Sequence, residues 1–136
     1  MMATFTEILG TAGVTCPDTA LADLAVPVLS GPQRQGDVLV IPTDDVFGEA
    51  SPIPTRGVAV VRGEATGNTH LLMGDGTWTP GDPSGAGVLL GYLTVPDGGE
   101  AWLIHTDEHG VNGIGPGRYR LHGKRELADE IRRVQD

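Results

Sequence analysis

The sequence predicts a mainly β fold, a small antiparallel β-barrel or sandwich. Glycine and proline supply 21 and 10 of the 136 residues, and both residues punctuate a chain with turns rather than extending helices. Short runs of Val, Leu and Ile lie between these turns, a pattern typical of strands in compact β proteins. The length is that of one domain, which we place at residues 36–136 after an N-terminal arm at 1–35.

The predicted arm is rich in Thr, Ala, Pro and Gly. Pro17 and Asp18 are typical of a helix start, and a helix there would place Leu21 and Leu24 on one face. Two interpretations stay open for this segment. It is an arm that becomes ordered against a partner, or it packs across the domain that follows.

From Gly36 onward the sequence alternates between turn signals and short apolar runs. Gly36 and Asp37 form a turn signal, and Gly91 predicts a bulge or kink inside the longest strand. Segments 43–56 and 74–87 are predicted loops because they are rich in Gly, Pro and Asp. β-branched and other apolar runs predict strands at residues 38–41, 57–62, 69–73, 88–95, 101–105 and 117–122.

The C-terminal segment predicts a helix over residues 125–135. Leu127, Ile131 and Val134 recur at helical spacing, with charged residues on the other faces. Acidic residues come first and arginines follow, which complements the helix dipole. We expect this helix to close one end of the barrel or sandwich.

Charge and cysteine content limit the function classes. The net charge is −9 with a sequence pI of about 4.7, which disfavours nucleic acid as a partner because phosphates would be repelled. Cys16 is the only cysteine, so no intrachain disulfide forms, and its Pro-adjacent setting favours a structural thiol over a catalytic one. We expect no membrane span and no signal peptide.

Three of the four histidines suggest a metal site. His105 and His109 flank an acidic stretch at the end of one strand, and His70 begins another. If these strands are neighbours, the three imidazoles converge, and neutral imidazole binds zinc, copper, iron and nickel. Glu64, or an acidic residue of the 107–108 pair, would supply an oxygen ligand. The alternative is that these histidines are surface or hydrogen-bonded residues without a ligand.

Several stretches resemble a group of small bacterial and phage proteins of cupin-like appearance. The resemblance implies a small β-barrel whose histidines hold a metal at the barrel mouth. Where the group reads His-x-His, this chain has Asn68-Thr69-His70, so one implied ligand is replaced by an amide, a poor ligand for a soft divalent metal. The matching stretches are Arg34–Leu39 with Ile41-Pro42, Gly63–Gly67 with His70, His105 with His109, Pro116–Arg120, and Arg125-Glu126 leading to Ile131–Val134 and Asp136.

The loop at residues 74–82 resembles loops of phage fibre and head-surface proteins. It holds Trp78 between glycines and prolines. An exposed tryptophan in such a loop is often an interface anchor, and the alternative is that it packs over its own barrel. With Trp78 we count Cys16, Leu21 and Leu24 as candidate interface residues.

Two function hypotheses follow from these observations. The first is a non-enzymatic structural or interaction protein without a cofactor, a homo-oligomer attached to a protein assembly such as a phage capsid shell, located in the virion or the cytoplasm. The alternative is a cupin-like metal-binding protein or metalloenzyme holding one divalent transition metal through His70, His105 and His109. Nucleophile-elbow, Walker and dinucleotide motifs are missing from the sequence. An accessory domain without its own ligand is a third reading.

Overall fold

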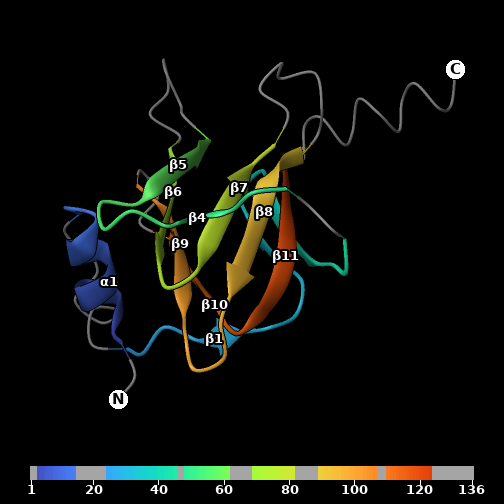
Figure 1. Cartoon of the computed structure of the whole chain (residues 1–136). Helices are drawn as coiled ribbons and strands as arrows, with labels where there is room; N and C mark the ends of the chain where they lie inside the picture. The colour runs from blue at the N-terminus through green and yellow to red at the C-terminus, as the bar shows by residue number, and fades with distance from the viewer. Residues whose placement is uncertain are drawn as a thin grey trace, which may run out of the picture.

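The computed structural model describes residues 3–14, 24–45, 48–61, 69–81, 89–106 and 110–123. These residues are mainly β and form two sheets in a sandwich-like arrangement (Figure 1). Neither sheet closes on itself within the described residues, so they do not form the closed barrel that was one of the two predicted alternatives. The predicted helix at residues 125–135 lies outside the described residues.

The first sheet has five strands in the order β1-β10-β9-β6-β5. Its neighbours are antiparallel except for β1 and β10, which run parallel. The strands are β1 (Val28–Leu29), β10 (Gly110–Ile114), β9 (Ala101–His105), β6 (His70–Gly74) and β5 (Val58–Val61).

The second sheet has six strands in the order β2-β3-β11-β8-β7-β4, all antiparallel. Figure 1 shows β7, β8 and β11 running side by side in front of the first sheet. The strands are β2 (Gln33–Gln35), β3 (Val38–Pro42), β11 (Gly117–Gly123), β8 (Leu89–Val95), β7 (Thr77–Pro80) and β4 (Ser51–Pro52).

The main core lies between the two sheets, because alternate residues of each strand point to the same face. Burying these aliphatic and aromatic side chains is the principal source of stability. The fully buried members include Val38, Val40, Leu72, Leu93, Leu103, Ile114, Tyr119 and Leu121.

A second cluster covers the outer face of the five-stranded sheet. The helix α1 (Phe5–Thr11) is capped at its N-terminus by Thr4, whose side-chain oxygen accepts from the Glu7 N–H. The helix packs its apolar residues against the sheet; the cluster comprises Ile8, Leu9, Val26, Met73, Trp102 and Ile104. Strand β9 is therefore covered on both faces, and all five of its residues are buried.

The six predicted strands are confirmed as β3, β5, β6, β8, β9 and β11. The irregularity predicted at Gly91 is also present. Leu121 pairs with Gly91, whereas the next residue, His122, pairs with Leu89. One extra residue of β8 is thus inserted opposite β11 beside Gly91, as in a β-bulge.

The prediction of a loop over residues 74–87 is wrong at its centre, where β7 forms the hydrogen-bonded neighbour of β8. Trp78 faces the core while Thr77 and Thr79 face outward, so the strand alternates despite its flanking glycines and prolines. Segment 43–56 likewise contains the two-residue strand β4. Strands β1, β2 and β10 and helix α1 were not predicted.

The described parts of residues 1–35 contribute α1, β1 and β2 to the structure. Ile8, Leu9 and Val26 of this segment are buried. The boundary predicted at residue 36 falls in the turn between β2 and β3. No helix among the described residues is long and apolar enough to cross a membrane.

Gly113 provides a test of how tightly β1 packs against β10. A Cβ atom at Gly113 would lie 2.3 Å from the Pro27 carbonyl oxygen and 2.9 Å from Cζ3 of Trp102. We expect Gly113→Ala to lower the free energy of unfolding by about 1–3 kcal/mol, because overpacking displaces the backbone. Chemical denaturation measures this. Gly31→Ala, which meets nothing within 4 Å, is the control, and equal effects of both variants would contradict the packing described.

Candidate functional site

His70 and His105 lie directly opposite each other on adjacent strands. His70 begins β6, His105 ends β9, and the two residues are register partners. Their ring centroids are 4.5 Å apart and their planes meet at 81°. The exposed fraction is 3% for His70 and 4% for His105, so both residues are buried. Both alternate with core residues of their strands, so the pair lies on the face that looks toward the second sheet.

The predicted convergence of His70 and His105 is thus what the structure displays. His109, the third predicted ligand, lies outside the described residues, as do Glu64, Asn68 and the 107–108 pair. Among the residues that are described, no group of three or more His, Cys, Asp or Glu side chains is arranged to hold a metal ion. A three-histidine centre therefore stays a prediction, with two of its members in contact.

Gln35 connects His70 to the second sheet. The Gln35 side chain is buried, and its Oε1 lies 2.9 Å from Nδ1 of His70. Its Nε2 donates to the Leu103 carbonyl oxygen at 2.7 Å and to Oδ1 of Asn112 at 3.0 Å. Its Nε2 also lies 3.4 Å from the Gly110 carbonyl oxygen. Because Gln35 is on β2 and its partners are on β6, β9 and β10, this one amide joins the two sheets.

Two more amides continue this connection. Nδ2 of Asn112 donates to Oε1 of Gln33 at 3.1 Å and to the Arg34 carbonyl oxygen at 3.3 Å. Nε2 of Gln33 donates to the carbonyl oxygens of Gly113, at 2.9 Å, and Leu29, at 3.3 Å. We refer to Gln33, Gln35 and Asn112 as the amide ladder. It occupies the side of the sandwich where β2 faces β10.

Gly36 completes the surroundings of His70. It lies in the turn between β2 and β3 with φ +55°, a backbone conformation that glycine adopts without strain. A Cβ atom there would lie 3.4 Å from Cε1 and 3.7 Å from Nε2 of His70. The turn thus lies beside the Cε1–Nε2 edge of the imidazole.

The amide ladder was not found from the sequence. The available signal is the spacing of Gln33 and Gln35, which places both on one face of a strand. Gln35 lies on an inner face, where buried polar groups require partners. The partners on β9 and β10 lie 68 to 80 positions away in the chain, and no local pattern indicates such contacts.

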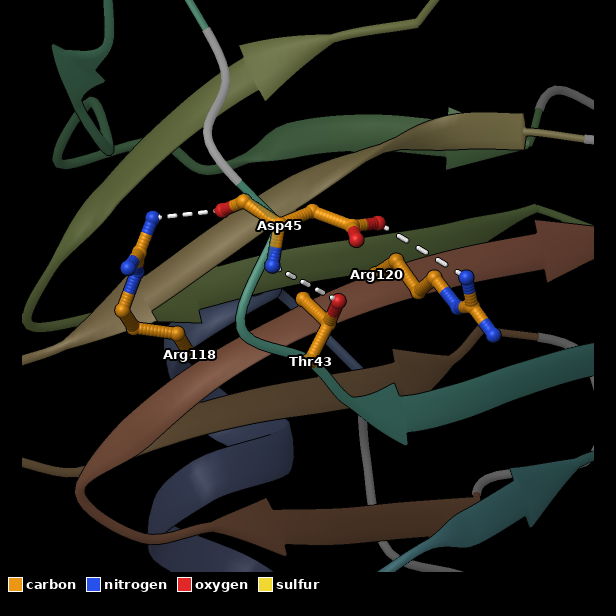
Figure 2. A network of polar contacts seen from close by, with 4 residues as sticks. All are labelled: Thr43, Asp45, Arg118 and Arg120. Atoms are coloured by element: carbon orange, nitrogen blue, oxygen red, sulfur yellow. Dashed lines mark hydrogen bonds and ion pairs between the residues drawn. The ribbon is translucent and has the colours of Figure 1, made fainter.

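A second polar cluster lies on the outer face of the six-stranded sheet (Figure 2). Nη2 of Arg118 donates to the Asp45 carbonyl oxygen at 2.7 Å, and Nη1 of Arg120 lies 3.6 Å from Oδ2 of Asp45. Thr43 accepts from the Asp45 N–H. These residues line a shallow hollow of about 540 Å³ together with Pro42 and Asp44. The side chains of this ion pair are 41% and 45% exposed, so water screens it, and it holds segment 43–45 against β11 with a modest energy.

The candidate interface residues have different surroundings. Trp78 is buried in the core, and a Cβ atom at Gly91 would lie 2.3 Å from its Cζ2, so the ring packs within its own domain rather than standing exposed. Leu24 is 55% exposed. Cys16 and Leu21 lie outside the described residues.

The fold and site define a two-sheet β protein with a buried pair of histidines, of which His70 is hydrogen-bonded to an amide side chain. The model of one family, described as a domain of unknown function (DUF8820), matches residues 34–124, which is well over half of the chain. The chain belongs to this family. The matched span contains both histidines, Gln35 and Asn112, and begins one residue after Gln33. No curated protein and no solved structure matches the chain significantly.

Asn112 tests how much the amide ladder contributes to stability. Asn112→Ala leaves Nε2 of Gln35 and Oε1 of Gln33 without one partner each. We expect a loss of about 1–3 kcal/mol in the free energy of unfolding, because partly buried polar groups lose their bonds. Arg34→Ala, on the exposed face of β2, is the control and should change stability by less than about 0.5 kcal/mol. A loss no greater than that of the control would show that the ladder is not stabilising.

Proposed function

We propose that this protein binds a divalent transition metal through the imidazoles of His70 and His105. The observation that carries the proposal is the contact between two buried rings at one end of adjacent strands. Imidazole is the commonest protein ligand for such metals. The hydrogen bond between Nδ1 of His70 and Oε1 of Gln35 also supports it, because metal-bound histidines almost always donate their second ring N–H to a fixed acceptor.

Two imidazoles do not complete a coordination sphere, since zinc sites generally use three or four protein ligands. His109 is the residue before Gly110, whose register partner is His105. It is therefore the first candidate for a third ligand, with Glu64 as a source of oxygen. Both assignments come from the sequence.

Metal retention by the full chain tests this function. After incubation with Zn²⁺ and desalting, we expect elemental analysis to find about one zinc per chain, as for a single histidine centre. His105→Ala should reduce retention about tenfold or more, with His105→Gln as a second variant closer in shape. His122→Ala is the matched control, because His122 is on β11 in the other sheet.

Two results of this experiment would overturn the proposed metal binding. Folding of each variant is verified by circular dichroism before metal is added. Lack of retained metal in the unmodified protein after supply of zinc, iron, nickel and manganese would overturn the proposal. So would folded His105 variants that retain as much metal as His122→Ala.

A second candidate function is a structural protein attached to a larger assembly, such as a phage capsid shell. The observation that favours it is a pair of exposed apolar side chains, Leu24 at 55% and Leu29 at 53%. Leu29 belongs to β1, which lies at the edge of the five-stranded sheet. An exposed leucine on an edge strand is typical of an association surface.

Point variants test this second function better than deletion of residues 1–33, which would remove Ile8, Leu9 and Val26 from the apolar cluster. We expect sedimentation velocity to show an oligomer for the unmodified chain. The double change Leu24→Ser and Leu29→Ser should shift it toward the monomer, because the association loses its apolar contact. Arg34→Ala is the control. A monomer at all concentrations that also stays away from assembled particles would contradict this candidate function.

A further inference from the structure

We propose that Gln35 is a positioning residue that fixes a proton on Nδ1 of His70 and so makes Nε2 the ligand atom of that ring. The proton assignment follows from the amide ladder alone. The assignment of Nε2 as metal ligand rests on the function proposed above.

The direction of the ladder is set first at Gln33. Its Nε2 faces two backbone carbonyl oxygens, those of Gly113 and Leu29. A carbonyl oxygen only accepts hydrogen bonds, so the NH₂ end of the Gln33 amide must point toward them. Oε1 of Gln33 therefore faces Asn112, and only a donor can lie opposite it.

The same constraint passes through Asn112 to Gln35. Nδ2 of Asn112 donates to Oε1 of Gln33 and to the carbonyl oxygen of Arg34, which leaves Oδ1 to accept from Gln35. Gln35 is fixed independently by the Leu103 carbonyl oxygen at 2.7 Å. Rotating the Gln35 amide by half a turn would bring two acceptors together at that distance.

Oε1 of Gln35 therefore faces Nδ1 of His70 at 2.9 Å as an acceptor. Nδ1 must carry a proton to complete this bond. In the neutral ring the lone pair then lies on Nε2, because neutral imidazole has one donor and one acceptor nitrogen. The backbone carbonyl oxygens that the ladder contacts thus determine which nitrogen of His70 carries the proton.

Gly36 lies on the Nε2 side of the same ring, at a position where any Cβ atom would be 3.7 Å from Nε2. Gln35 and Gly36 are adjacent in the chain, so one short segment holds one nitrogen and borders the other. A metal that binds His70 is accordingly expected at Nε2, with Nδ1–H bound to Gln35 as the supporting contact.

Nitrogen-15 NMR of the metal-free protein tests the proton assignment. Long-range ¹H–¹⁵N correlation spectra distinguish the two neutral tautomers of each histidine ring. We expect the Nδ1–H form for His70 in the unmodified chain and loss of this preference in Gln35→Leu and Gln35→Met. Gln35→Glu still offers an oxygen to Nδ1, and its second oxygen can face the Leu103 carbonyl oxygen only as a protonated O–H. With that carboxyl protonated, His70 should keep the Nδ1–H form. The ring of His122 is the internal control.

An Nε2–H tautomer of His70 in the unmodified protein would overturn the proposal. An unchanged Nδ1–H form in folded Gln35→Leu or Gln35→Met would also overturn it. If neither variant folds, the spectrum of the unmodified chain decides the proton assignment, and comparison with Gln35→Glu decides whether an acceptor oxygen suffices to maintain it. A role confined to packing would leave the tautomer unchanged in every folded variant.

Zinc titration separates this inference from the proposed function. We expect Gln35→Met to bind zinc about 10–100-fold more weakly than the unmodified chain, as for loss of a supporting hydrogen bond. The bound state should show the largest nitrogen shift at Nε2 of His70. If the NMR spectra show the expected tautomers but the protein binds no zinc, the proton assignment is kept and the proposed function is overturned. Equal zinc affinity in Gln35→Met would overturn the positioning role at the metal.

Discussion

The hydrogen bonds of the amide ladder are the constraint that joins the two sheets at one side of the sandwich and determines the surroundings of His70. Backbone pairing holds each sheet together, but at the side where β2 faces β10 the two sheets meet through Gln33, Gln35 and Asn112. Such a network must be fully satisfied, because a buried polar group without a partner costs more than its bond contributes. The ladder meets this requirement by ending on backbone carbonyls, and it therefore holds β2 against β10 and determines the environment of His70.

The position of His105 depends on a second constraint. Strand β9 lies between the main core and the cluster under α1, so all of its residues are buried. A strand buried on both faces has few ways to move, since neighbours on each side fill the space it would enter. The histidine pair is thus held at His70 by hydrogen bonds and at His105 by packing. These two constraints together hold both imidazole rings in place in the folded chain.

Much of the fold was predictable because its central strands are short apolar runs bounded by Gly and Pro. Strand β7 was missed because its single inward residue, Trp78, is surrounded by residues typical of loops. Strand β10 was missed because Gly110, Asn112 and Gly113 have low strand propensity, and Gly113 is required by the close approach of Pro27. The histidine pair could be predicted from strand positions. Its amide partners could not, since their contacts depend on register between distant segments.

The arrangement of the ladder also bears on where the folding unit begins. The family match starts at Arg34, yet Gln33 anchors the ladder and Val26 with α1 covers the outer face of β6 and β9. A fragment cut at residue 34 would expose Met73, Trp102 and Ile104 to water and leave Asn112 without Gln33. The span matched by the family model therefore leaves out segments that cover apolar side chains of this chain.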